Sequence, residues 1–237
     1  MLLKVLYADE HLVAIDKPAG LLVHRSALDA HEDVFALQLL RDQLGRPVWP
    51  AHRLDKGTSG LLLFALSSEV ASALGQAFEA GAMKKRYLAL VRGWPAASEG
   101  LIDHGLARDP ERASAGQELL PARTAWRRLA RVEWPLASDA RFPTTRGALL
   151  ECRPESGRRH QIRRHLKHIA HPIIGDATHG KGPLNRALAG YLGRQRLWLH
   201  GLELALTHPL SGTPLLLRAP PGPEWQMLRS QGDWSDG

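Results

Sequence analysis

Short runs of apolar residues open the chain and predict a β-hairpin. Leu2 to Leu6 and Leu12 to Ile15 are apolar segments of strand length, and the charged pair Asp9-Glu10 lies between them. Charged turn residues between two such runs are typical of antiparallel strands joined by a tight connection. Lys17-Pro18-Ala19-Gly20 then ends the pattern, because proline and glycine interrupt regular structure.

Two segments carry the helical period. In Val34 to Leu44 the apolar residues recur at helical spacing, with Asp33 as a candidate N-cap and Gly45 at the position expected just past the last turn. Ser67 to Ala80 predicts a second helix, stopped by Gly81.

The uninterrupted apolar run Leu61 to Leu66 predicts a strand that is buried on both faces. Other segments have strand composition without a decisive period: Tyr87 to Val91, Thr124 to Val132, Ala148 to Cys152 and Leu197 to Leu206. Helices and strands do not alternate strictly, so the prediction is an α+β fold with a mixed, mostly antiparallel central sheet flanked by helices and loops.

The remaining segments are rich in Pro, Gly, Ala and Ser. Gly93 to Ala122 and Pro135 to Gly147 are predicted to be surface loops or insertions rather than a domain boundary, and the tail after Pro220 is expected to fray. A chain of 237 residues is long enough for one sizeable core, although length alone also fits two small domains, and we expect a single domain over 1–237.

Composition narrows the compartment and the partners. No uncharged apolar stretch reaches about 18 residues, and charged residues already occur before Gly20, so a cytoplasmic protein is expected. Cys152 is the only cysteine, which excludes an intrachain disulfide and predicts a buried thiol. The net charge of +7 favours polyanionic partners, although solvated helix and strand faces explain clustered charge equally well. The clusters are Lys84-Lys85-Arg86; Arg123, Arg127, Arg128 and Arg131; and Arg158, Arg159, Arg163, Arg164 and Lys167.

The segment from His52 to Gly60 places one carboxylate among basic and small polar residues, directly before the buried strand. A loop fixed at a strand end is a common place for chemistry. Between Arg53 and Lys56, the Asp55 carboxylate is expected to be ionised, which suits a nucleophile or a base. Taken alone, an aspartate in a Gly/Ser/Thr turn is more often a structural turn residue.

Arg158 to Ala170 is predicted to be a helix with two different faces. Ile162, Leu166 and Ile169 share an apolar face, and Arg159, Arg163 and Lys167 form a basic stripe beside it. The nearby histidines raise the question of a metal site. His160 and His165 are five apart, not the four that stack two ligands on one helical face, so no metal is expected.

Several motifs, in order along nearly the whole chain, resemble RluA-type pseudouridine synthases. His52-Arg53-Leu54-Asp55 followed by Thr58-Ser59-Gly60 is similar to the family's aspartate signature. The further matches are Lys17-Pro18-Ala19-Gly20, Lys85-Arg86-Tyr87-Leu88-Ala89-Leu90-Val91, Ser156-Gly157-Arg158-Arg159-His160-Gln161-Ile162-Arg163, His171-Pro172-Ile173-Ile174-Gly175-Asp176 and Leu199-His200. Ser156 stands where the family has threonine.

The resemblance implies an α+β fold with a catalytic cleft across the sheet, and an enzyme that isomerises uridine in RNA. Asp55 would be the nucleophile, Tyr87 would stack on the flipped uracil, and Arg163 would pair with Asp55. The glycosidic bond to nitrogen breaks and a bond to carbon 5 forms, so the reaction is redox-neutral and implies no cofactor. The target nucleotide must leave the helical stack. Residues expected to bind the RNA are Arg53, His52, Lys84, Lys85, Arg158, Arg159, His160 and Gln161.

Within the family, further residues are similar to a subgroup that modifies uridine 65 of tRNA. These are Leu21 to Ser26, Leu28-Asp29, Val34 to Ala36, Arg41 to Gln43, His179-Gly180 and Asn185-Arg186. The Lys-Pro element begins at Lys17, so an N-terminal S4 RNA-binding module is not expected. Three alternatives stay open: a synthase acting on rRNA, a catalytically silent RNA-binding relative, and a base-excising glycosylase.

Overall fold

In the computed structural model, residues 1–25, 32–110, 112, 115–137 and 142–236 are described. Ser26, Leu28 and Asp29 of the subgroup motif lie outside these ranges, as do parts of the two predicted loops. The described residues form two compact units. Unit 1 comprises Met1–Lys85 and His200–Pro220, and unit 2 comprises Arg86–Leu199 and Pro221–Gly237. No described helix is both long and apolar enough to cross a lipid bilayer.

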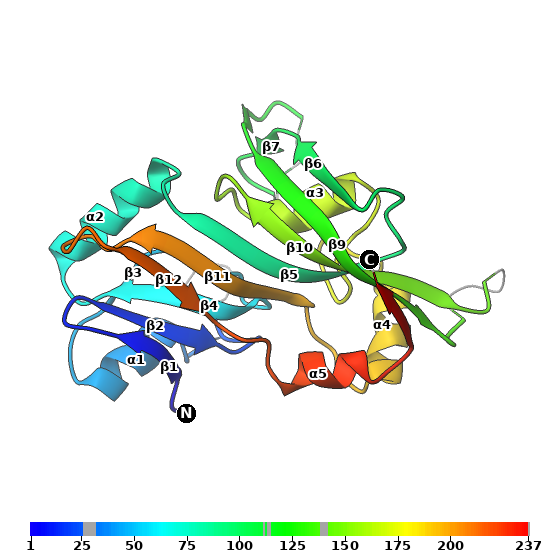
Figure 1. Cartoon of the computed structure of the whole chain (residues 1–237), viewed down its shortest axis with the longest axis horizontal. Helices are drawn as coiled ribbons and strands as arrows, with labels where there is room; N and C mark the ends of the chain where they lie inside the picture. The colour runs from blue at the N-terminus through cyan, green and yellow to red at the C-terminus, as the bar shows by residue number, and fades with distance from the viewer. Residues whose placement is uncertain (26–31, 111, 113–114, 138–141, 237) are drawn as a thin grey trace. The chain divides into compact units, whose positions relative to one another are not determined.

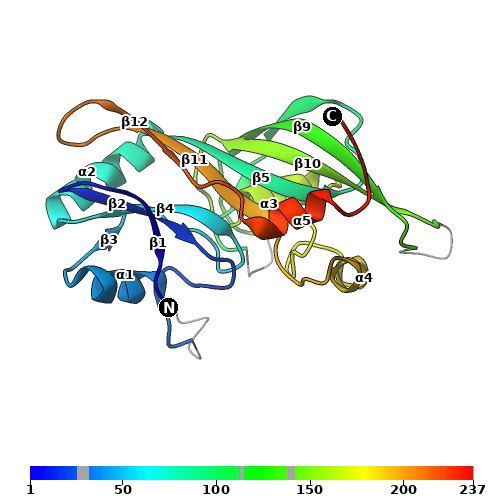
Figure 2. The ribbon, with the colours of Figure 1, turned by 60° about the horizontal axis from the view of Figure 1, so that its bottom comes forward.

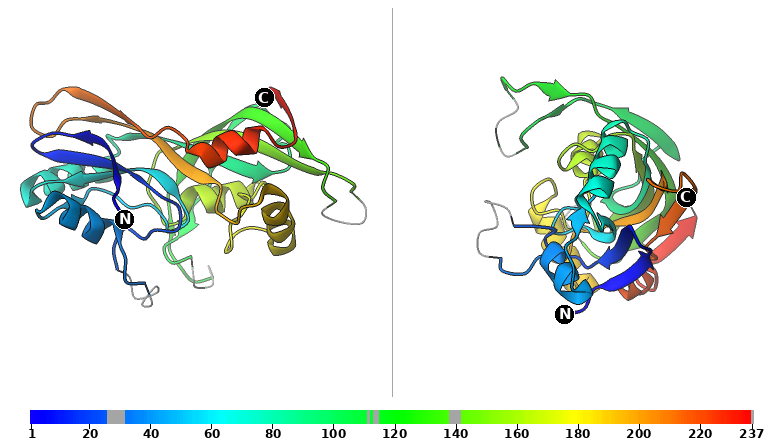
Figure 3. Two further views of the ribbon diagram at one scale, coloured as in Figure 1. Left: turned by 90° about the horizontal axis from the view of Figure 1, so that it is seen from below. Right: turned by 90° about the vertical axis from the view of Figure 1, so that its left-hand side faces the viewer.

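Unit 1 is built on strands that pair around the buried β4 (Figure 1). Its strands are β1 (Lys4–Ala8), β2 (Leu12–Lys17), β3 (Trp49–Pro50), β4 (Ser59–Ala65), β11 (Leu199–Thr207) and β12 (Pro214–Arg218). β2 and β3 pair with β4 antiparallel, whereas β11 pairs with β4 in parallel. β11 and β12 form the orange hairpin in Figure 3. All seven residues of β4 are buried, as the continuous apolar run predicts.

The helices of unit 1 are α1 (Ala36–Leu44) and α2 (Ser68–Glu79). Val70 and Leu74 of α2 join the core formed with β2, β4, β11 and β12. The predicted glycine end of α1 is confirmed, since Gly45 is left-handed with φ 65°. The predicted Asp33 cap is wrong: Phe35 occupies the N-cap without a side-chain bond, and Leu22 and Val23 carbonyls accept from the first-turn amides.

Unit 2 contains an antiparallel sheet with α3 packed along it (Figure 2). The strands are β5 (Lys84–Arg92, which begins in unit 1), β6 (Glu99–Asp103), β7 (Leu106–Ala107), β8 (Leu119–Leu120), β9 (Arg123–Trp134), β10 (Thr145–Pro154) and β13 (Asp233–Asp236). The helices are α3 (Gln161–His168), α4 (Gly182–Leu192) and α5 (Pro223–Arg229). β10 pairs with both β5 and β9, and β6 and β13 pair with opposite ends of β9.

The α+β class with a mostly antiparallel sheet is confirmed, and so is the opening hairpin. Two predictions of irregular structure are wrong. The segment Gly93 to Ala122 contains β6, β7 and β8, and the tail after Pro220 forms α5 and then β13. β6 and β13 are edge strands that carry mostly exposed residues, so backbone hydrogen bonds hold them in the sheet. Their sequences therefore lack the alternation of apolar and polar residues that would predict a strand. The single domain and the cleft across the sheet stay predictions.

Candidate active site

Asp55 lies in a tight turn that leads directly into β4. The Thr58 amide donates to the Asp55 carbonyl at 3.0 Å, which closes the turn Asp55–Thr58. Leu54 and Thr58 on either side are buried, whereas Asp55 is half-buried and Arg53 is exposed. The fold thus anchors both ends of the turn and leaves Asp55 half-buried between them. This arrangement fits a reacting group on a rigid support.

Lys17 ties this turn to the preceding Lys-Pro loop. Its side chain is fully buried, and Nζ donates to the carbonyl oxygens of Pro18 at 2.9 Å, Leu21 at 2.7 Å and Lys56 at 3.2 Å. The Gly20 amide also donates to the Lys56 carbonyl, at 2.8 Å. A buried ammonium is stable only when polar groups replace its water. Lys17 therefore fixes the backbone one residue after Asp55.

Two histidines brace β4 next to the turn. His52 Nε2 accepts from the Leu63 amide at 3.2 Å. Burial, assisted by the charge of Lys85, lowers the pKa of His52 to about 4, so the ring is neutral and can accept this bond at neutral pH. The Ser59 hydroxyl lies 2.9 Å from His200 Nδ1, and His200 Nε2 lies 2.8 Å from the Ala219 carbonyl oxygen. Both imidazoles thus support the strand that follows Asp55.

Lys84 and Lys85, the predicted RNA contacts at the start of β5, differ in environment. Lys84 is exposed, whereas Lys85 is half-buried and burial lowers its pKa. Lys84 is therefore the better candidate for a phosphate contact, because it is exposed and RNA can reach it.

In unit 2, Tyr87 lies on the face of β5 that carries α3. It packs against a core that includes Ala89, Val91 and Ile162, and it stays half-buried. The predicted apolar face of α3 is confirmed, since Ile162 and Leu166 are buried and Ile169 packs beside them. An aromatic ring fixed on a strand and partly accessible is a suitable surface for stacking a base.

Arg163 forms a buried bidentate ion pair with Asp176. Nε lies 2.7 Å from Oδ2 and the second terminal nitrogen lies 2.9 Å from Oδ1. Burial opposes ionisation of Asp176, but the hydrogen bonds and charge of Arg163 outweigh it and lower the pKa of this carboxyl. The predicted basic stripe on α3 is therefore wrong at Arg163, which is interior. Asp55 belongs to unit 1 and Arg163 to unit 2, and their pairing stays a prediction.

Helix α3 is shorter than the predicted range, because the chain at both ends leaves the helical conformation. His160 and Ala170 have φ 54° and 65°, so Arg159 precedes the helix. Gln161 is buried and engaged at both ends of its amide: Oε1 accepts from Ser156 Oγ and the Arg158 amide, and Nε2 donates to the Arg123 carbonyl. Its side chain therefore organises the start of α3.

The other predicted RNA-binding residues of unit 2 line the same segment. His160 Nδ1 lies 3.1 Å from His179 Nε2. The exposed Arg158 donates to the Pro121 carbonyl at 3.2 Å, and Arg159 lies 3.8 Å from Asp109. Their contacts with RNA, like those of Arg53, His52, Lys84, Lys85 and Gln161, stay predictions.

The histidines of α3 have partners within the protein. Burial lowers the pKa of His165, which hydrogen-bonds Thr124 Oγ1 at 2.9 Å and the His104 carbonyl at 3.0 Å. His168 stacks on the His104 ring at 3.8 Å between centroids. In the described part of the chain, no group of three His, Cys, Asp or Glu side chains is placed to hold a metal ion.

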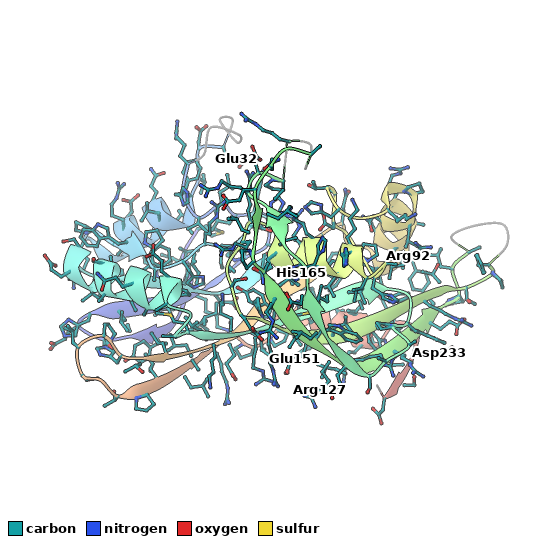
Figure 4. The ribbon with its side chains drawn as sticks, turned by 90° about the horizontal axis from the view of Figure 1, so that it is seen from above. Glu32, Arg92, Arg127, Glu151, His165 and Asp233 are labelled. Atoms are coloured by element: carbon teal, nitrogen blue, oxygen red, sulfur yellow. The ribbon has the colours of Figure 1, made fainter. Side chains whose placement is uncertain are left out.

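A second buried carboxylate lies on the face of the unit 2 sheet away from α3. Glu151 pairs with Arg86 and, at 2.6 Å, with Arg153, and it borders a pocket of about 490 Å³ with Trp126 and Arg127. Figure 4 shows Glu151 and Arg127 on one side of the strands and His165 on the other. Cys152, the next residue, is buried among apolar side chains on the α3 side, where burial raises its pKa. The pocket is therefore not on the Tyr87 face.

The sequence motifs indicated Asp55, Tyr87 and Arg163 but assigned no role to Lys17 or Asp176. Both lie inside quoted motifs, and a charged residue between apolar neighbours, as in Ile173-Ile174-Gly175-Asp176, is the signal that marks a buried charge. The sequence does not show their partners, because the Lys17–Lys56 bond joins residues 39 positions apart and the Arg163–Asp176 bond joins residues 13 positions apart.

Comparison with known proteins gives matches over most of the chain. The family model described as RNA pseudouridylate synthase matches residues 11–168. The tRNA pseudouridine synthase C of Vibrio cholerae is 46% identical, over 99% of this chain and 98% of its own length. The protein of that name from Pasteurella multocida is also 46% identical, with the same coverage.

Among solved structures, human RNA Pseudouridylate Synthase Domain Containing 1 shares the fold. Its TM-score is 0.73 at 24% identity, over 93% of this chain and 84% of that one. The family match covers more than half of the chain and the relatives exceed 40% identity over nearly all of it. This chain therefore belongs to the RNA pseudouridylate synthase family and is an isomerase that acts on RNA.

Proposed function

We propose that the substrate is tRNA and that the target is uridine 65. The observation that carries this proposal is the 46% identity, over 99% of the chain, with a relative named tRNA pseudouridine synthase C. A tRNA substrate also fits the net charge of +7. We expect an enzyme that modifies tRNA to act in the cytoplasm.

In the proposed mechanism, Asp55 attacks the flipped nucleotide from the turn that precedes β4. As the carboxylate bonds to the sugar, the bond between the sugar and N1 breaks. The uracil then rotates, and its C5 bonds to the sugar as the bond between the sugar and Asp55 breaks. The proton on C5 is lost and N1 gains a proton, so atoms and electrons balance without an oxidant. Tyr87 stacks on the base, a contact worth about 1 to 3 kcal/mol. Arg163 pairs with the Asp55 carboxylate and orients it.

The decisive experiment incubates the protein with an unmodified tRNA transcript and maps pseudouridine by mass spectrometry. We expect modification at uridine 65 and none in a transcript with cytidine there. Asp55→Asn should abolish product while RNA binding survives, because phosphate contacts supply most of the affinity. Asp42→Asn is the matched control, since Asp42 is exposed and pairs with Arg41 on α1 of the same unit.

The same assay separates the alternatives. Release of free uracil identifies a glycosylase, and binding without either product identifies a silent relative. Pseudouridine in an rRNA fragment but not in tRNA moves the substrate to rRNA. Normal turnover by Asp55→Asn would make Asp55 a structural turn residue.

A further inference from the structure

The Asp176 carboxylate is enclosed by donors on both oxygens. Oδ2 accepts from Arg163 Nε at 2.7 Å. Oδ1 accepts from the Arg163 terminal nitrogen at 2.9 Å and from the amides of Thr178 at 3.0 Å and His179 at 2.8 Å. The exposed fraction is 0% for the Asp176 side chain and 9% for that of Arg163. The carboxylate therefore has one orientation, and the guanidinium plane is fixed with it.

The turn that carries Asp176, residues 175–180, is itself anchored to neighbouring elements. Asn185 of α4 accepts from the Gly175 amide at 2.9 Å and donates to the Asp176 carbonyl at 2.9 Å. Gly175 has φ +79°, and a Cβ there would lie 1.7 Å from the Arg196 carbonyl oxygen. The segment before β11, α4 and α3 thus all hold this turn, so Asp176 is a rigid support for Arg163.

We propose that Asp176 is a positioning residue that aims the Arg163 guanidinium for the reaction. The inference rests on the proposed function, in which Arg163 acts on Asp55. A guanidinium has five N–H donors in a fixed planar fork, and the bidentate contact uses two of the three nitrogens. Once those two are fixed, the direction of the third nitrogen is fixed as well.

A purely stabilising role accounts poorly for this pair. Burying two charges has a desolvation cost that cancels much of their attraction, and apolar residues of the same volume often stabilise as well or better. The pair is explained if the directed charge of Arg163 is used in catalysis. The two explanations differ in what a substitution of Asp176 does. A stabilising role predicts an effect on folding alone, whereas a positioning role predicts that the rate of the folded enzyme falls as well.

The test measures single-turnover rates at saturating tRNA, and tRNA affinity separately, for Asp176→Asn. We expect the rate to fall about ten- to a hundredfold, the loss that follows removal of a hydrogen bond between charged groups, with affinity unchanged. In an Arg163→Ala background, Asp176→Asn should cause no further loss of rate. The matched control is Glu224→Gln, which neutralises another carboxylate paired with a largely buried arginine, Arg196, and should leave the rate unchanged.

A wild-type rate for Asp176→Asn, or a full additional loss in the Arg163→Ala background, would overturn the proposal. If Asp176→Asn does not fold, Arg163→Lys decides: it keeps the charge and the Asp176 turn but cannot make the bidentate contact. A wild-type rate for Arg163→Lys would then reject the proposal, and a tenfold loss would support it. Absence of pseudouridine with the wild-type protein would instead reject the proposed function.

Discussion

Lys17 in unit 1 and Asp176 in unit 2 are buried charges of opposite sign, and the protein holds them in different ways. Three backbone carbonyls surround the Lys17 ammonium, contributed by the Lys-Pro loop and the Asp55 turn. The Asp176 carboxylate instead joins two backbone amides to one arginine side chain. Lys17 therefore connects backbone to backbone, whereas Asp176 connects backbone to a side chain predicted to act in catalysis.

This difference predicts different consequences of removing each charge. An ammonium is a compact charge that places few limits on direction, so Lys17 fixes where two loops lie. A carboxylate paired with a guanidinium fixes the orientation of the guanidinium plane as well as its position. We expect loss of Lys17 to act on folding, and loss of Asp176 to lower turnover as well as stability.

Lys17→Met should have the largest effect on stability. It leaves the carbonyls of Pro18, Leu21 and Lys56 without their ammonium donor, so the free energy of unfolding should fall by about 3 kcal/mol or more. Urea denaturation measures the loss. Lys4→Met, at an exposed position of β1, is the control and should change little. Equal stability of Lys17→Met and wild type would show that these bonds contribute nothing net.

The glycines beside the two charges sharpen the comparison. Gly20 and Gly175 both have positive φ, +89° and +79°, but a Cβ at Gly20 meets nothing within 4 Å, whereas one at Gly175 clashes with the Arg196 carbonyl. Gly20→Ala should therefore cost only the conformational penalty, about 1 to 2 kcal/mol. Gly175→Ala should cost about 3 kcal/mol, because backbone must also move. Similar thermal midpoints for the two variants would contradict this account.

The sequence patterns predicted well where hydrophobic burial alone determines structure. The apolar run of β4, the opening hairpin and α2 follow from hydrophobic burial. Motif order indicated Asp55, Tyr87 and Arg163, and their roles in catalysis stay predictions. The failures have another cause. β13 is held by backbone pairing with β9, and α1 is capped by the carbonyls of Leu22 and Val23. Every residue except proline carries the same backbone N–H and C=O groups, so these hydrogen-bond partners leave no mark on the sequence.

Acid should weaken the contribution of the Asp176 carboxylate to the free energy of unfolding. Asp176→Asn has no carboxylate at this position and should not show that loss. The folded-state pKa of Asp176 lies below its usual value, so its stabilisation is present above the unfolded pKa, about 3.9, and is lost as pH falls through the folded pKa. Asp176→Asn should be about 2 kcal/mol less stable than wild type at pH 7. The difference should shrink below about pH 4. A gap that stays constant from pH 7 to pH 3 would show that the charge does not contribute.

The smallest effect is expected at Lys84, a charge that is exposed rather than buried. Lys84→Ala should leave the unfolding free energy unchanged, because exposed side chains contribute little to folding. It should weaken tRNA binding at low salt and reduce the slope of log affinity against log salt by about one, since one phosphate contact releases about one counterion. Binding titrations at several salt concentrations give the slope. Lys4→Ala, at an exposed position of β1, serves as the control and should leave the slope unchanged. Equal slopes for Lys84→Ala and wild type would show that Lys84 makes no phosphate contact with the tRNA.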